Sequence, residues 1–177
     1  METSLQNKKK IEPRQYHNQV DLDKMCALLQ AGRKAYNGTY YIHIGDLKWW
    51  LFYPAWEYDP WQHISLWDDP ADPQRLLGWA LFSLRWGSFD VYVQPELRGT
   101  PQAESMYIWA EQKLEATLRA SGKGKFYVMW ISQGDNFLNE HYQRRGLQRT
   151  PDDVVYMSCS FPGMLTEGPI PAGNTVA

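Results

Sequence analysis

One stretch of the chain has the layout of an anion-binding site. The sequence RGTPQA, residues 98–103, follows a strand-like run and precedes a long helical pattern. The N-terminus of a helix offers free N–H donors and the positive end of the helix dipole, and both favour a phosphate group. Pro101 has no N–H at the position where such a loop would carry a glycine. The sequence therefore predicts a phosphate loop whose donor set is short by one.

Two residues of this loop weaken the anion site while they strengthen the helix. Pro101 removes a hydrogen bond to a charged group, which is worth roughly 1.5–3 kcal/mol. Glu104 in the same turn adds an unfavourable exposed charge worth about 0.3–1 kcal/mol. Proline at the first helical position and an acidic first turn both favour helix formation. We expect anion binding to be impaired rather than excluded, because other N–H groups remain. They belong to Gly99, Thr100, Gln102 and Ala103.

The composition limits the classes of function. The chain has 177 residues, the size of one domain, and its 18 Lys and Arg residues nearly balance 20 Asp and Glu residues. We therefore expect no nucleic-acid binding. No apolar run approaches the roughly 20 residues of a membrane-spanning helix and no signal-peptide pattern opens the chain, so we expect a cytoplasmic protein without membrane association. Cys26 and Cys159 are interpreted as reduced core thiols, and the four histidines have no metal-ligand spacing, so no metal is expected.

Hydrophobic periodicity and caps predict one α/β domain, in which a mixed sheet carries helices on both faces. We expect a disordered tail over 1–13, the domain over 14–162 and a linker-like tail over 163–177. Asp21 and Asp135 are the expected helix N-caps. The expected strands are 14–20, 61–69, 75–86, 89–95, 125–131 and 154–161, and the expected helices are 21–36, 45–53, 101–120 and 135–146. The segment 125–131 is continuously apolar and is expected to be a buried strand.

An aromatic segment leaves two interpretations open. Five of the nine tryptophans fall between 49 and 67. Such a segment is either a wall that packs over the sheet or a surface for a ligand or a second subunit.

The order of these elements resembles the GNAT acetyltransferase superfamily. The residues that carry the resemblance are VYVQPELRG at 91–99 and YQRRGL at 142–147, together with an early helix followed by GDLKWW at 45–50. The match spans about residues 14–161. It implies a mixed, mostly antiparallel central sheet flanked by helices on both faces. It also implies an N-acetyltransferase that moves an acetyl group from acetyl-CoA to an amine by direct attack.

The resemblance implies where acetyl-CoA would bind. The pantetheine arm would lie in a splay between the fourth and fifth strands and would bond to the backbone of Val91, Tyr92 and Val93. The family loop reads Gln/Arg-x-x-Gly-x-Gly/Ala, and here Pro101 replaces its central glycine. The pyrophosphate would contact residues around the helix start, namely Arg98, Gly99, Thr100, Gln102 and Ala103.

The resemblance also implies the acid of the reaction. A family tyrosine near the CoA sulfur gives a proton to the leaving thiolate, and its counterpart here is Tyr142. The alternative is that Tyr142 only packs on Leu138 along the helix face. The frequent family Asn falls on Asp135, with Asn136 beside it, so Asn136 is a candidate CoA contact.

A carboxylate would serve as the base for the acceptor amine. Asp90 on the fourth strand is the first candidate and Glu57 the second. The alternative for Asp90 is a solvated residue after the Gly87–Ser88 turn.

Three hypotheses follow for the whole chain. It is an N-acetyltransferase with a small-molecule or peptide amine as acceptor. Alternatively, it is a degenerate acetyltransferase-fold module that acts in ligand binding or as a structural or dimerisation domain. In the third hypothesis, the chain pairs with a second acetyltransferase-like domain, or with its own copy as a homodimer.

Overall fold

The computed structural model describes residues 11–36, 41–52 and 59–151. Several predictions fall outside these ranges and are not addressed by the structure. They concern the strand 154–161 with Cys159, the tail 163–177, the carboxylate of Glu57 and most of the tail 1–13.

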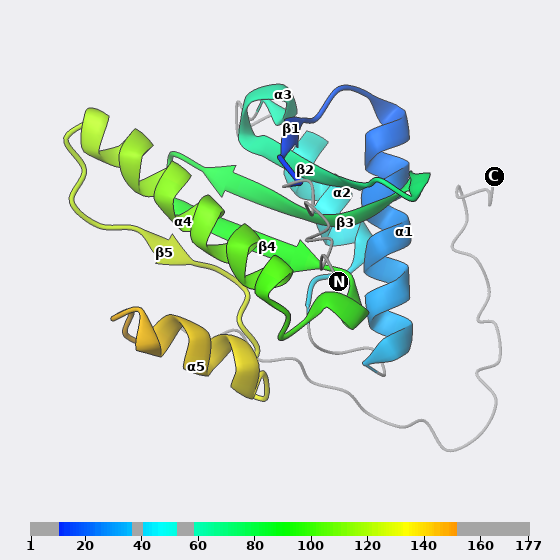
Figure 1. The fold of residues 1–177 in the computed structure, drawn as a ribbon. Coiled ribbons are helices and arrows are strands. Elements are labelled where there is room, and N and C mark those ends of the chain that lie inside the picture. Colours follow the sequence, from blue (N-terminus) through cyan, green and yellow to red (C-terminus); the bar gives the residue numbers. More distant parts are fainter. Residues whose placement is uncertain (1–10, 37–40, 53–58, 152–177) are drawn as a thin grey trace, which may run out of the picture.

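A five-stranded sheet forms the centre of the molecule (Figure 1). Its spatial order follows the sequence, from β1 to β5. Adjacent strands are antiparallel except for β4 and β5, which are parallel. The mixed, mostly antiparallel sheet is therefore as expected. The strands are β1 Arg14–Gln15, β2 Ile64–Asp69, β3 Asp72–Ser83, β4 Ser88–Val93 and β5 Tyr127–Val128.

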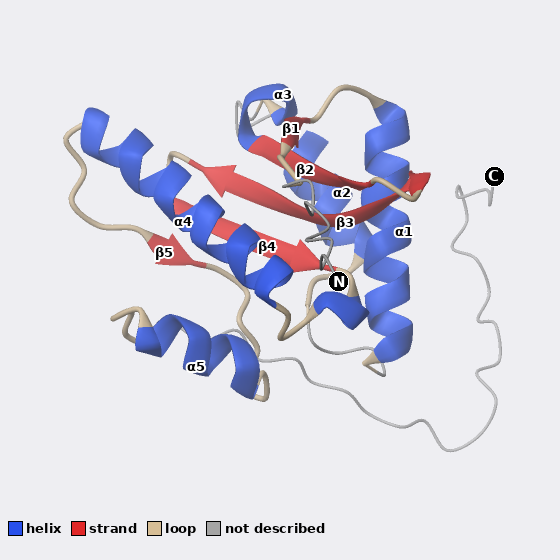
Figure 2. Ribbon diagram, in the orientation of Figure 1, coloured by secondary structure: helices blue, strands red, loops and turns tan. Residues whose placement is uncertain are grey.

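Helices cover both faces of this sheet (Figure 2). On one face α4 and α5 enclose a hydrophobic cluster, and on the other α1 and α2 enclose a second cluster. The helices are α1 Gln19–Ala35, α2 Ile44–Phe52, α3 Pro60–His63, α4 Pro101–Ala120 and α5 Asn136–Arg144, with a short 3₁₀ turn η2 Pro95–Leu97. The α4 bounds agree with the expected helix 101–120.

Strand β4 divides its side chains between the two clusters. Phe89, Val91 and Val93 face α4 and α5. Tyr92 packs against the α1–α2 cluster, and Asp90 shares that side because side chains alternate along a strand. This is the alternation that the sequence FDVYV predicts.

The first helix begins earlier than the sequence indicated. Asn18, not Asp21, is the N-cap, and its side chain accepts a hydrogen bond from the N–H of Val20. Asp21 instead accepts two hydrogen bonds from Arg14, at 2.7 and 2.8 Å. The N–H of His17 also donates to Asp21, at 2.7 Å, so neighbours in the preceding strand segment engage the carboxylate that the sequence assigned to the cap. The first strand is only Arg14–Gln15, because α1 already begins at Gln19.

The prediction for residues 125–131 was wrong in part. Only Tyr127 and Val128 are in strand conformation, and the side chains of Tyr127 and Met129 are exposed. The apolar run has another cause, because residues 128–131 line a cleft. Strand β3 also ends early, at Ser83, where a turn begins that closes with Gly87 at a positive φ of 62°.

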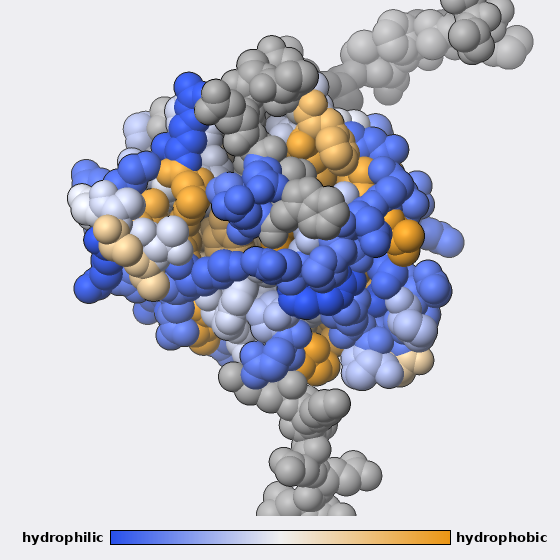
Figure 3. Space-filling view, turned by 90° about the horizontal axis from the view of Figure 1, so that it is seen from above, coloured by the Kyte–Doolittle hydropathy of each residue, from blue (hydrophilic) through white to orange (hydrophobic). Residues whose placement is uncertain are grey.

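The surface carries separate hydrophobic patches among hydrophilic residues, as the view in Figure 3 shows. The large apolar side chains with the most exposure are Val20, Trp49, Phe52 and Trp86. Among the described residues, no helix combines the length and the apolar character that crossing a bilayer requires.

A close approach between α1 and β4 gives a test of this packing. A Cβ atom on Gly32 would lie 1.8 Å from Tyr92 Oη and 2.8 Å from Tyr92 Cζ. Inside a helix, alanine in place of glycine raises the free energy of unfolding by about 0.5–1 kcal/mol. Overpacking a core lowers it by about 1–3 kcal/mol. The rings of Tyr41 and Trp79 hold Tyr92 in place, so the clash outweighs the gain. We expect Gly32→Ala to lower the free energy of unfolding by about 1–2 kcal/mol in urea titrations.

The double variant Gly32→Ala/Tyr92→Phe removes the closer of the two clashing atoms. Its loss in unfolding free energy should be smaller than the sum of the losses in the two single variants. A Gly32→Ala protein as stable as the parent would contradict this packing.

Candidate functional site

Strands β4 and β5 separate after Phe89. Their pairing covers Ser88 with Tyr127 and Phe89 with Val128, and the last backbone bond runs from the N–H of Met129 to the Phe89 carbonyl at 3.0 Å. Backbone groups in a strand alternate in direction, so the N–H and C=O groups of Val91 and Val93 face the β5 side as those of Phe89 do. The structure therefore has an open strand edge at the position where the sequence predicts the splay.

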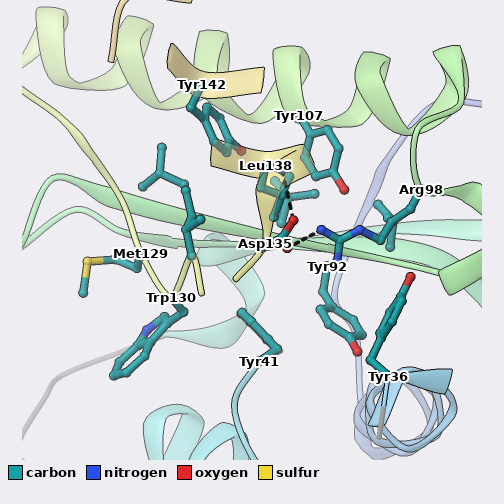
Figure 4. A pocket seen from close by; sticks show the side chains of 14 residues that line it. Tyr36, Tyr41, Tyr92, Arg98, Tyr107, Met129, Trp130, Asp135, Leu138 and Tyr142 are labelled. Carbon is teal, nitrogen blue, oxygen red and sulfur yellow. Dashed lines mark hydrogen bonds and ion pairs between the residues drawn. The ribbon is translucent and has the colours of Figure 1, made fainter. Parts of the chain in front are cut away.

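A narrow cleft fills the space between the separated strands (Figure 4). Val91–Val93 form one wall and residues 128–131 the other. Its free volume is about 30 Å³, far below the roughly 300–1,000 Å³ of a typical ligand pocket. In Figure 4, the side chains of Tyr107 and Tyr142 enter from one side, and those of Tyr36, Tyr41 and Trp130 enter from the other. The cleft is thus preformed but nearly filled by its own side chains.

An ion pair bridges the cleft between Arg98 and Asp135. Asp135 is buried and caps α5 by accepting a hydrogen bond from the N–H of Leu138 at 3.0 Å. The Arg98 guanidinium also lies over the rings of Tyr36 and Phe137, at 5.4 and 5.7 Å from their centroids. Burial alone would lower the pKa of Arg98, but the Asp135 carboxylate raises it above its ordinary value, so the guanidinium stays charged. The bridge ties the loop before α4 to the start of α5.

The start of α4 matches the expected helix chemistry, with Pro101 at the first helical position and Gly99 at a φ of 78°. Thr100 is the N-cap, and its hydroxyl accepts a hydrogen bond from the N–H of Ala103 at 3.3 Å. The N–H of Thr100 donates to the Leu97 carbonyl at 3.0 Å. Two of the four expected donors are therefore engaged within the protein. Within the described ranges, only the N–H groups of Gly99 and Gln102 remain free at this turn.

Tyr142 is a buried side chain of the cleft wall. Its side chain is 4% exposed and lines the cleft from α5. Burial, with Tyr107 and Asp90 nearby, raises the pKa of Tyr142 well above its ordinary value, so the phenol keeps its proton. Its ring packs edge-on against Phe89 and Tyr107, with centroids 6.2 and 6.3 Å apart. The alternative of packing on Leu138 is compatible with this position, because Leu138 lines the same cleft.

Asp90 is buried, with 3% of its surface exposed, so the alternative of a solvated residue after the turn is wrong. Burial raises the pKa of Asp90 well above its ordinary value, and the neighbouring Tyr41 hydroxyl offsets part of this rise. Tyr41 Oη and Asp90 Oδ1 face each other, although neither completes a hydrogen bond of good geometry. Asp90 therefore gives up its proton less readily than an exposed carboxyl does.

Asn136 lies away from the cleft. Its exposed side chain borders a separate polar hollow on the outer side of α5, together with Gln143 and Arg149. Of the predicted cosubstrate contacts, Val91, Tyr92, Val93 and Arg98 line the cleft, and Gly99, Thr100, Gln102 and Ala103 lie at the start of α4. Asn136 is the one that the structure does not bring to this region. In the described ranges, no group of three or more His, Cys, Asp or Glu side chains is placed to hold a metal ion.

Tyr36, Tyr41 and Trp130 are among the wall residues that sequence reasoning missed. Tyr36 and Tyr41 flank the Asn37–Gly38 turn signal, and both side chains reach the cleft. Trp130 has a φ of 59°, a left-handed conformation that is rare for a bulky residue and costs about 1–3 kcal/mol. Its ring contacts Trp50 of α2 at a centroid distance of 5.0 Å. The Tyr-x₄-Tyr spacing around a turn was the available signal for the tyrosines, and nothing in the sequence marks the Trp130 conformation.

Comparisons with known proteins find similarity in three-dimensional structure but none in sequence. No family model and no curated protein matches the chain. An acetyltransferase from Streptococcus agalactiae superposes with a TM-score of 0.56 at 14% identity, over 85% of this chain and 92% of that one. Two others superpose with lower scores. A GCN5-related N-acetyltransferase from Sphaerobacter thermophilus has a TM-score of 0.47 at 18% identity, over 63% of this chain and 34% of that one. An aminoglycoside 6'-N-acetyltransferase from Acinetobacter haemolyticus has a TM-score of 0.44 at 14% identity, over 85% and 98%.

The chain therefore has an acetyltransferase fold, which the Streptococcus structure shares over most of both chains. The mixed, mostly antiparallel sheet with flanking helices is the GNAT-like fold that the order of the sequence motifs predicts. The chain spans 34% of the length of the Sphaerobacter protein.

The burial of Asp90 gives a pH-dependent prediction. Its pKa in the folded protein is raised, so the folded state binds this proton more tightly than the unfolded state does. The contribution of this bound proton to the unfolding free energy is fully present below the unfolded pKa of about 3.9. It is lost as the pH rises toward the folded pKa. Asp90→Asn removes this loss. We expect the advantage of the variant over the parent in unfolding free energy to grow as the pH rises from about 4 toward neutral.

Urea denaturation across this pH range measures the effect. The exposed Asp23, changed to Asn, is the matched control and should show no such trend. A difference between Asp90→Asn and the parent that does not change with pH would contradict a raised pKa at Asp90.

Proposed function

We propose that the chain is an N-acetyltransferase that moves an acetyl group from acetyl-CoA to an amine by direct attack, with Tyr142 as the acid. The observation that carries the proposal is the open edge of β4 with the protonated Tyr142 phenol lining the same cleft. The shared acetyltransferase fold supports it. The acceptor class, a small-molecule or peptide amine, and a homodimer or second-domain partner in the cytoplasm remain predictions from the sequence.

In the proposed reaction the amine nitrogen attacks the thioester carbonyl carbon. The C–S bond then breaks, and the departing thiolate takes the proton of Tyr142. The nitrogen gives up one proton to solvent or a base as the amide forms, and the Tyr142 phenolate recovers one. Because burial raises the pKa of Tyr142, the phenol stays protonated and able to donate through the neutral and mildly alkaline range.

The residues around the cleft fit acetyl-CoA in part. The backbone groups of Val91 and Val93 offer a strand edge to an extended amide-containing arm. The free N–H groups of Gly99 and Gln102 and the Arg98 guanidinium offer donors to a diphosphate. However, Arg98 is paired with Asp135, and the free volume of the cleft is only about 30 Å³. Binding therefore requires the side chains of the cleft to move apart.

The role of Tyr142 is tested with the conservative variant Tyr142→Phe. We expect kcat to fall roughly 100-fold or more, because general acid catalysis contributes about 10²–10⁴-fold. The KM for acetyl-CoA and its Kd by calorimetry should change little, since the ring remains in place. Release of free CoA thiol in the presence of a set of primary amines measures the rate.

Tyr127→Phe is the matched control, because Tyr127 is an exposed tyrosine on β5. Its rate should equal that of the parent. An unchanged kcat in Tyr142→Phe would contradict the acid role. Absence of saturable acetyl-CoA binding at millimolar concentration would remove the enzyme proposal altogether and leave a non-catalytic module.

The Arg98–Asp135 bridge generates a separate prediction for affinity. Asp135→Asn keeps a side chain that caps a helix well, but it removes the charge that holds Arg98. The freed guanidinium can then bind a phosphate group, and such a charge-assisted bond contributes roughly tenfold or more in affinity. We expect the Kd for acetyl-CoA to fall by about this factor in calorimetric titrations.

Asp72→Asn is the control, an exposed aspartate at the first position of β3. It changes the net charge equally and should leave the Kd unaltered. A weaker affinity in Asp135→Asn would mean that the ion pair builds the site rather than closes it.

A further inference from the structure

Two ion pairs join the ends of helix α5 to α4 and to the loop before it. At the start of α5, Asp135 pairs with Arg98 of that loop. At the end of α5, the Arg145 guanidinium donates to both carboxylate oxygens of Glu111 on α4, at 2.6 and 3.0 Å. The residues between these two ion pairs hold α5 to α4 by packing, and one of them is a buried histidine.

The imidazole of His141 lies inside this interface, with 2% of the residue exposed. Its ring stacks on Phe137 at an interplanar angle of 22°, and its centroid lies 5.3 Å from that of Tyr107 and 4.9 Å from that of Tyr142. In the part of the chain that the structure describes, its Nε2 atom has no hydrogen-bond partner. Its Nδ1 atom lies 4.0 Å from Glu104 Oε1, too far for a hydrogen bond. The imidazole is therefore packed like an apolar ring, although it can take up a proton.

The surroundings of His141 disfavour its charged form. Burial lowers the pKa of His141 below its ordinary value, because an imidazolium loses its hydration there. Glu104 and Glu111 act against this shift, whereas Arg145 and Arg144 act with it. The groups that face the ring are Glu104, Tyr107 and Glu111 from α4 and Tyr142, Arg144 and Arg145 from α5, and Arg98 lies beside the adjacent Phe137 ring. The packed form of α5 thus holds a neutral His141 at neutral pH.

Helix α5 depends on this packing for its own stability. It has 9 residues, Asn136–Arg144, and so short a helix is not stable alone in water. The same helix brings Leu138 and Tyr142 to the wall of the cleft. Loss of the contacts with α4 would therefore unfold α5 locally and open one wall of the cleft.

We propose that His141 makes the packing of α5 on α4 depend on pH, with protonation releasing α5 and opening the cleft. In released α5 the imidazole is in water and takes up a proton near its ordinary pKa of about 6.5. In packed α5 its pKa is lower, so a falling pH favours the released form. The packing is strongest above about pH 6.5, weakens as the pH falls, and changes no further below the lowered pKa. This inference goes beyond the proposed reaction and does not depend on acetyl-CoA.

Hydrogen exchange of the backbone amides of residues 139–144, resolved by NMR without any ligand, tests the release. Rates are compared between about pH 7.5 and 5.5, above the range in which ordinary carboxyl groups titrate, after correction for the intrinsic effect of pH on exchange. We expect the protection of the α5 amides to fall by up to about tenfold per pH unit below about 6.5. The buried residues Ala110 and Leu114 of α4 are internal controls and should keep their protection.

Three variants separate the role of His141 from general effects of acid. His141→Phe keeps an aromatic ring that cannot titrate, so the protection of α5 should stay constant over this pH range. Glu104→Gln removes a carboxylate that favours the imidazolium, so the protection should fall further than in the parent. His17→Phe is the matched control, because His17 is an exposed histidine before α1. It should behave as the parent.

Constant protection of α5 in the parent from about pH 7.5 to 5.5 would overturn the proposal. An equal loss of protection in His141→Phe and in the parent would do the same. If His141→Phe does not fold, NMR titration of the His141 imidazole in the parent decides. A pKa below about 6.5 that Glu104→Gln lowers further supports the proposal, and a pKa at or above the ordinary value overturns it. Because no acetyl-CoA is present, either result leaves the proposed reaction to its own tests.

Discussion

Beyond Phe89 the backbone of β4 has no neighbouring strand on the β5 side, and the chain has to cover that edge by other means. It does so with side chains, namely a group of tyrosines, Trp130 in a left-handed conformation and the bridge from Arg98 to Asp135. Each of these is a compromise in stability, because strained backbone and buried charge both cost free energy. An ordinary continued strand would have avoided them. The separation of the strands therefore carries a cost in stability.

At the start of α4, helix stability and anion binding compete for the same N–H groups, and the sequence favours the helix. Proline at the first helical position and the Thr100 cap order the turn, while the same cap engages an N–H that an anion would need. Two free N–H groups and one guanidinium remain for a diphosphate. The guanidinium is held by Asp135, so access to it depends on opening the bridge. In this account the affinity for acetyl-CoA is set by how easily the bridge opens more than by the missing donor of Pro101.

Local signals in the sequence predicted the fold well, and long-range contacts limited the rest. Helix α4 has the expected bounds because its proline and its closing Ser-Gly pair are strong local signals. The cap of α1 was misplaced because Asp21 pairs with Arg14, a contact that composition does not reveal. For the site, the family resemblance implied that Val91, Val93 and Tyr142 lie together, and all three line the same cleft, while their roles stay predictions. The Arg98–Asp135 bridge joins residues 37 positions apart, and the buried Asp90 lies beside Tyr41, which is far from it in the sequence. Neither can be derived from local periodicity.

The central claim is that the free edge of β4 receives the acyl-CoA arm, and backbone amide exchange measures this directly. The N–H groups of Val91 and Val93 face the gap, whereas that of Tyr92 faces β3 and is an internal control. Residue-resolved hydrogen exchange by NMR, with and without saturating acetyl-CoA, compares the three. The account predicts slower exchange at Val91 and Val93 when acetyl-CoA binds, with little change at Tyr92. Binding of acetyl-CoA that leaves the exchange of Val91 and Val93 unaltered would contradict it.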